Sequence, residues 1–74
     1  MTTTTRYETT VGAWIAAGRP CSARWSLALE TVSCALIARA RQVPAALAMG
    51  YLDRARIAHE CAAQARAYSY SQEG

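Results

Sequence analysis

Residues Ser22–Val43 read SARWSLALETVSCALIARARQV, and this stretch decides the fold of the chain. Large apolar side chains recur within it at steps of four, three and four residues, at Trp25, Leu29, Val32 and Leu36. This spacing places the four side chains on one face of an α-helix. Ser is a residue type that caps helix N-termini, so we expect the helix to begin just after Ser22. The stretch therefore predicts an amphipathic helix against which the rest of the chain packs.

A short helix is predicted before this stretch. Thr9 or Thr10 can cap it, and it runs to Ala17 with three apolar side chains, Val11, Trp14 and Ile15. Gly18 suits the left-handed position that ends a helix, and the Pro two residues later prevents continuation. Residues 1–8 and 69–74 are polar, and we expect both ends of the chain to fray.

A third helix is predicted from Pro44 to about Tyr68, because Pro is favoured in the first turn of a helix. Six of its residues share one face: Leu47, Tyr51, Ala55, Ala58, Ala62 and Ala65. The four Ala make most of this face smooth, which allows a facing helix to come close. Gly50 lies inside the pattern, and the sequence leaves open whether it breaks the helix.

These patterns predict one domain over residues 1–74 with an all-α fold, a hairpin or bundle of two or three helices. The side chains expected to be buried are Trp25, Leu29, Val32, Leu36, Leu47 and Tyr51. The chain contains seventeen Ala and no Phe, so few large side chains are available for a core. Small domains with little apolar area to bury are commonly stabilised by association. We therefore expect a homodimer.

Charge and cysteine content narrow the class of protein. The net charge is +3, and all eight basic residues are Arg, spread along the chain rather than gathered in the dense patch of a nucleic-acid-binding protein. The three Cys have no paired spacing, which argues against a disulfide scaffold and favours a reducing compartment. No apolar run approaches the roughly 18 residues that a membrane span needs, and no secretory signal is recognisable. We expect a cytoplasmic protein with no membrane span.

The residues that could carry catalysis or hold a metal form no motif of either kind. His59 and Cys61 are two residues apart, so they point in different directions on a helix. No Cys-x-x-Cys pair of the kind used in structural zinc sites is present. A nucleophilic pair of Cys21 or Cys34 with His59 would lack a glycine-rich loop to stabilise an oxyanion. We expect no metal, no cofactor and no enzymatic activity.

The surface of the helices suggests a binding protein. Leu27, Cys34 and Ile37 are apolar but lie outside the main stripe, and a second apolar surface on a small protein marks an interface more often than an error. Apolar anchors and Arg side chains outside the core give the candidate partner-binding residues, which are Leu27, Ile37, Arg41, Arg54 and Arg56. We predict a non-enzymatic protein-binding module.

Two alternatives stay open. Residues 45–50, AALAMG, resemble the first helix and turn of a helix-turn-helix, with an Ala four residues before the turn Gly. The apolar residue expected six places after Gly50 is replaced by Arg56, although Arg54, Arg56 and Arg66 could reach phosphates. The first alternative is therefore a small DNA-binding regulator. The second is a structural dimer or assembly subunit.

Residues 38–67, ARARQVPAALAMGYLDRARIAHECAAQARA, resemble small accessory proteins of temperate phages of Pseudomonas-type hosts. Some members of that class are short helical dimers that bind and disable a host protein. The resemblance implies a phage-encoded inhibitor that acts in the host cytoplasm on a bacterial host protein. The candidate targets that it implies are a type IV pilus assembly ATPase, a CRISPR effector or a transcriptional regulator. The likeness lies in residue usage over most of the chain, so it assigns no role to an individual residue.

Overall fold

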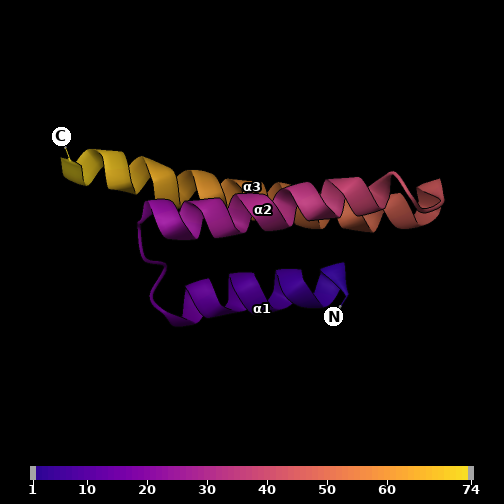
Figure 1. The fold of residues 1–74 in the computed structure, drawn as a ribbon, viewed down its shortest axis with the longest axis horizontal. Helices are drawn as coiled ribbons and strands as arrows, with labels where there is room; N and C mark the ends of the chain where they lie inside the picture. The colour runs from indigo at the N-terminus through magenta and orange to yellow at the C-terminus, as the bar shows by residue number, and fades with distance from the viewer. Residues whose placement is uncertain (1, 74) are drawn as a thin grey trace.

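The computed structural model of the chain describes residues 2–73, with side chains over residues 2–66. Within this range the chain forms three α-helices, α1 (Thr3–Ala16), α2 (Ala23–Ala40) and α3 (Ala45–Glu73). Figure 1 shows α2 and α3 as a long antiparallel hairpin, with α1 running beside it in the direction opposite to α2. The predicted all-α fold is confirmed.

The start of α1 differs from the prediction. Thr2 is the N-cap, and its Oγ1 accepts a hydrogen bond from the Thr5 N–H at 3.1 Å. The predicted cap at Thr9 or Thr10 is therefore wrong, and residues 3–8, expected to fray, are helical. The first half of α1 also gains tertiary support, because Tyr7 packs against both apolar clusters of the core. That contact is not visible in a local sequence pattern.

The other helix ends follow local chemistry. α2 begins after Ser22, whose Oγ accepts a hydrogen bond from the Trp25 N–H at 3.2 Å, as predicted. Gly18 has a φ of 90°, which confirms its expected left-handed conformation at the end of α1. α3 begins one residue after Pro44 and runs through Gly50 to Glu73 without a break, so its helical backbone includes most of the tail expected to fray. Gly74 lies outside the described residues.

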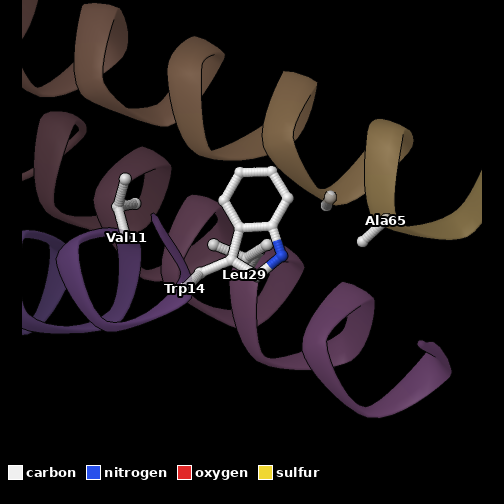
Figure 2. Close-up of a cluster of buried hydrophobic side chains, with 5 residues drawn as sticks. Val11, Trp14, Leu29 and Ala65 are labelled. Carbon is white, nitrogen blue, oxygen red and sulfur yellow. The ribbon is translucent and has the colours of Figure 1, made fainter. Parts of the chain in front are cut away.

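The core lies where α1 covers one side of the hairpin. Figure 2 shows the indole of Trp14 reaching from α1 between α2 and α3, above Leu29 and towards Ala65. Trp14 is 2% exposed, and its Nε1–H donates a hydrogen bond to the Pro20 carbonyl at 2.9 Å. A second cluster continues the core along the hairpin and contains Val32, Leu36, Ala55 and Ala58. The predicted burial of Leu29, Val32 and Leu36 is confirmed.

The core prediction is wrong at three positions. Trp25 is only partly buried at the edge of the first cluster, because Trp14 occupies the central place. Tyr51 is also partly buried, and Leu47 is 60% exposed. Thr2 and Thr3, at the start of α1, lie around the same shallow pocket as Tyr51. α1 therefore begins opposite Tyr51. It does not reach Leu47, which lies one helical turn before Tyr51 on α3, so Leu47 stays exposed.

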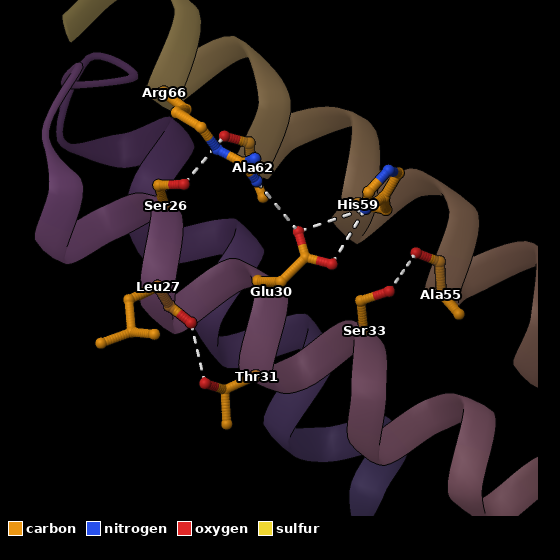
Figure 3. A network of polar contacts seen from close by, with 9 residues as sticks. All are labelled: Ser26, Leu27, Glu30, Thr31, Ser33, Ala55, His59, Ala62 and Arg66. Carbon is orange, nitrogen blue, oxygen red and sulfur yellow. Dashed lines mark hydrogen bonds and ion pairs between the residues drawn. The ribbon is translucent and has the colours of Figure 1, made fainter.

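A seam of small residues joins α2 to α3. Ser26 Oγ donates a hydrogen bond to the Ala62 carbonyl at 3.2 Å, and Ser33 Oγ donates one to the Ala55 carbonyl at 2.8 Å (Figure 3). The two contacts are seven residues apart on each helix, so a single antiparallel register holds along the hairpin. A hydroxyl reaches a facing carbonyl only if the backbones lie close together, which the buried Ala face of α3 permits.

Candidate protein-binding face

The side of the hairpin opposite α1 carries a groove between α2 and α3. In Figure 3 the indigo ribbon of α1 runs behind the hairpin, and this side faces the viewer. The groove has a volume of about 410 Å³. We call it the open groove, and its lining residues are Glu30, Ser33, Ile37, Leu52, Ala55, Arg56 and His59.

The register of the seam explains which residues line the open groove. Ser33 and Ala55 are seam residues with small side chains, so they form a low floor. The walls are two large apolar side chains that stand on either side of this floor. Ile37 of α2 is 38% exposed and Leu52 of α3 is 45% exposed. The result is an apolar hollow in which two helices present side chains to solvent.

Charged groups stand at one end of the groove and along its α3 side. His59 Nδ1 lies 2.9 Å from a Glu30 carboxylate oxygen, and Arg66 Nη2 lies 3.5 Å from the other oxygen (Figure 3). A carboxylate only accepts hydrogen bonds, so Nδ1 carries the proton in this contact. Arg56 Nη1 lies 3.3 Å from Glu60, and both of these side chains are more than half exposed. Exposed ion pairs of this kind add little to the stability of the fold. They do fix the positions of the charged groups around the groove.

The structure brings two of the five candidate partner-binding residues to this groove. Ile37 and Arg56 line it, whereas Arg41 is the C-cap residue of α2 and is not one of the lining residues. Leu27 is 70% exposed, but in Figure 3 it points away from α3 and so lies outside the groove. Arg54 lies on the α1 side, where Nη1 donates a hydrogen bond to the Gly50 carbonyl at 3.1 Å.

Sequence reasoning did not select the two floor residues of the groove, nor three larger side chains that line it, Glu30, Leu52 and His59. Their distance along the chain from the seam residues could have identified them. Leu52 and His59 each precede a residue of the α3 seam by three positions, and Glu30 precedes Ser33 by three. Residues three apart lie on neighbouring parts of a helix surface. Using this signal requires knowing that Ser33 and Ala55 face each other.

A cluster of metal-ligating side chains and a helix able to cross a bilayer are both absent from the part of the chain that the structure describes. Among the side chains of residues 2–66, no group of three or more from His, Cys, Asp or Glu is placed to hold a metal ion. Over residues 2–73, none of the helices combines the length and apolar character that crossing a bilayer requires. The His59 imidazole pairs with a carboxylate, and the three cysteines are free thiols. The open groove presents apolar side chains together with charged pairs.

Two titratable side chains on the α1 side, those of Cys61 and Tyr7, lead us to expect that the stability of the fold depends on pH. Burial raises the pKa of the Cys61 thiol from its ordinary value of 9.0; Arg19 opposes this shift, and the Glu60 carboxylate adds to it. Burial likewise raises the pKa of Tyr7. A group whose pKa is higher in the folded state stabilises the fold below its unfolded pKa, and this contribution is lost as pH rises through the folded pKa. Stability should therefore fall above pH 9, the ordinary thiol pKa.

Urea unfolding at several pH values from neutral to alkaline measures this dependence. Cys61→Ala should make the alkaline loss of stability shallower, because the variant no longer exposes a thiolate on unfolding. Cys34→Ala is the matched control, since Cys34 is exposed on α2. If the two variants lose stability with pH at the same rate, Cys61 does not contribute to the dependence.

Comparison with known proteins gives no relative from which a function could be transferred to the open groove. No protein-family model matches the chain, and no curated protein or solved structure is significantly similar to it.

Proposed function

We propose that this chain is a non-enzymatic protein-binding module and that the open groove is its binding surface. Two large apolar side chains, one from each helix of the hairpin, are exposed around the same groove. Ile37 and Leu52 line the groove, and Met49, which is 65% exposed, lies one turn before Leu52. Apolar surface that no element of a small protein covers is typical of an interaction site. The exposed pair of Ile37 and Leu52 beside one groove is the observation that carries the proposal.

The nature of the partner follows from the resemblance to phage accessory proteins. We propose a bacterial host protein, met in the host cytoplasm, and inhibition as the outcome of binding. A type IV pilus assembly ATPase, a CRISPR effector and a transcriptional regulator are the candidate targets that the resemblance supports. The groove itself supports only the more general part of the proposal, which is binding through an apolar, Arg-flanked surface.

A homodimer is also part of the proposal. The α3 side of the core consists of Ala, and Leu47 is 60% exposed in the single chain, so a second copy has apolar surface to cover. A dimer that forms through a surface other than the open groove would leave the groove free for another protein. A dimer with no further partner is the second candidate function, that of a structural or assembly subunit.

Ile37→Asp tests the protein-binding function, and Ile57→Asp provides a matched control. Ile37 lies in α2 and Ile57 in α3, and each side chain is 38% exposed. Only Ile37 lines the open groove. In affinity capture from nuclease-treated host lysate, we expect Ile37→Asp to recover about tenfold less partner, as for loss of a buried apolar anchor. Ile57→Asp should recover as much partner as the unsubstituted chain. Circular dichroism of each variant shows that it is folded.

The same variants separate the proposal from its competitors. Equal recovery by both variants would show that the open groove is not the binding surface. Sedimentation velocity shows whether the chain dimerises and whether Ile37→Asp prevents it. Self-association without any Ile37-dependent partner would favour the structural dimer.

The DNA-binding alternative loses the element on which it depends. Because α3 is continuous through Gly50, residues 45–50 contain no turn. Arg54 lies on the α1 side, and Arg56 pairs with Glu60, so these two side chains do not form one cationic surface. Capture of nucleic acid in the absence of nuclease, weakening steeply with added salt, is the result that would restore this alternative.

A further inference from the structure

We propose that the chain dimerises by exchanging α1, so that α1 of each copy packs on the α2–α3 hairpin of the other. This exchange rests on the homodimer of the proposed function and specifies how that dimer forms. It does not use the open groove, which lies on the opposite side of the hairpin. Two observations carry it: the backbone conformation of the connection between α1 and α2, and the contacts that hold α1 in place.

The connection between α1 and α2 holds one residue in an unfavourable backbone conformation. The N–H of left-handed Gly18 donates a hydrogen bond to the Ile15 carbonyl at 3.0 Å, and the N–H of Arg19 donates one to the Trp14 carbonyl at 2.9 Å. This capping arrangement needs one left-handed residue. Arg19 nevertheless has a positive φ as well, of 54°, a region that only Gly adopts without steric cost. It also precedes Pro20, which favours an extended backbone in the residue before it.

This strain arises from the reversal of the chain rather than from the end of the helix. Because α1 runs antiparallel to α2, the chain turns back within residues 17–22 (Figure 1). Opening the turn lets Arg19 become extended, and Pro20 prevents α1 and α2 from merging into one helix. Six extended residues span about 20 Å, which is comparable to the 21 Å width of the molecule. Short connections under strain favour the exchange of the element that they hold.

Exchange preserves the contacts that hold α1. Its buried side chains are Val11 and Trp14, which pack in one cluster with Leu29 of α2 and two Ala residues of α3 (Figure 2). The Trp14 Nε1–H also donates a hydrogen bond to the Pro20 carbonyl at 2.9 Å. The same side chains meet the same hairpin surface when that hairpin belongs to another copy. The occupant of this face is therefore defined by the structure itself, because α1 already fits it.

Since the contacts are equal in the two forms, the balance between closed monomer and exchanged dimer depends on the connection. A short flexible linker holds a tethered element at an effective concentration of about 1 mM. Strain in the linker lowers this value, so α1 of a second copy competes at lower chain concentrations. Each dimer also relaxes two strained connections. We therefore expect the dimer in solutions of about 0.1–1 mM chain, and the closed monomer on dilution.

Sedimentation of full-length chains, refolded from urea over a range of concentrations, tests the role of the strain. Arg19→Gly removes the steric cost of the positive φ, so it should favour the closed monomer and raise the dissociation constant of the dimer at least about tenfold. Arg19→Ala is the matched control. Ala keeps the cost of the positive φ but lacks the guanidinium that acts on the Cys61 thiol, so its dimer should dissociate like that of the unsubstituted chain. Circular dichroism shows that each variant is folded.

Isotope-filtered NMR shows which chain supplies α1 to each hairpin. Equal amounts of labelled and unlabelled chain are mixed in urea and refolded at high concentration, and the dimer is isolated. In the exchanged dimer, the contact between the Trp14 indole and the Leu29 side chain joins two chains. In any dimer that forms without exchange, this contact stays within one chain. We expect nuclear Overhauser effects between Trp14 of one chain and Leu29 of the other.

Three results would overturn the exchange. They are a chain that stays monomeric at about 1 mM, a contact of Trp14 with Leu29 only within single chains, and an equal response of the dimer to Arg19→Gly and Arg19→Ala. A dimer that Ile37→Asp dissociates would also overturn it, because Ile37 lines the open groove. Partner capture that depends on Ile37, in a chain without exchange, would leave the protein-binding function standing. An exchanged dimer without such capture would remove that function alone.

Discussion

Replacing Trp14 with Ala is expected to lower the free energy of unfolding by about 3–5 kcal/mol, the range found when a large aromatic is removed from a core. Trp14 is the largest fully buried side chain, and it joins α1 to Leu29 of α2 and to the Ala face of α3. The variant also loses the hydrogen bond from the indole Nε1–H to Pro20. A domain of this length has about 4–11 kcal/mol of stability in total, so much of it would be lost.

Urea unfolding followed by circular dichroism measures the effect, and Trp25→Ala is the control. Trp25 is the other Trp of the chain and contacts the same cluster, but it is only partly buried. Its removal should therefore cost clearly less than the removal of Trp14. A larger loss for Trp25→Ala would mean that α1 does not hold the central position in the core. Trp14→Phe, which keeps most of the apolar contact, should recover part of the lost stability.

Enlarging the seam at Ala62 is expected to have the second largest effect. Ala62 is fully buried, and its carbonyl accepts the hydrogen bond from Ser26 Oγ. Ala62→Leu places a branched side chain in the seam, where α3 contacts α2 through the hydrogen bond from Ser26. We expect the free energy of unfolding to fall by about 3 kcal/mol, the upper end of the usual cost of overpacking.

Ala63→Leu is the matched control for this change. Ala63 is the next residue of the same helix and is exposed, so the identical substitution there meets no facing backbone. Leu and Ala have similar helix propensities, and a surface substitution of this kind usually changes stability by less than about 0.5 kcal/mol. Urea midpoints of the two variants give the comparison. Equal midpoints would contradict the close approach of the two helices.

The candidate site was only partly predictable from the sequence. Ile37 was selected because it is apolar and lies outside the main stripe, and Arg41 and Arg56 because they are cationic and outside the core. Leu52 and His59 were not selected, because nothing in the local pattern of α3 connects them to Ile37 or Glu30. Their juxtaposition depends on the register set by two hydrogen bonds across the seam, from Ser33 to Ala55 and from Ser26 to Ala62.

The amino-acid sequence by itself determined the all-α class, the cap at Ser22, the apolar stripe of α2 and the small-residue face of α3, but not where α1 begins. These features arise from interactions within one or two helical turns, so residue spacing and capping chemistry are enough to specify them. Only the tertiary structure decided that Trp14 rather than Trp25 fills the core, and that α1 covers one side of the hairpin and leaves the other open. Spacing shows which face of a helix is apolar, but which neighbour covers it depends on contacts between residues far apart in the chain.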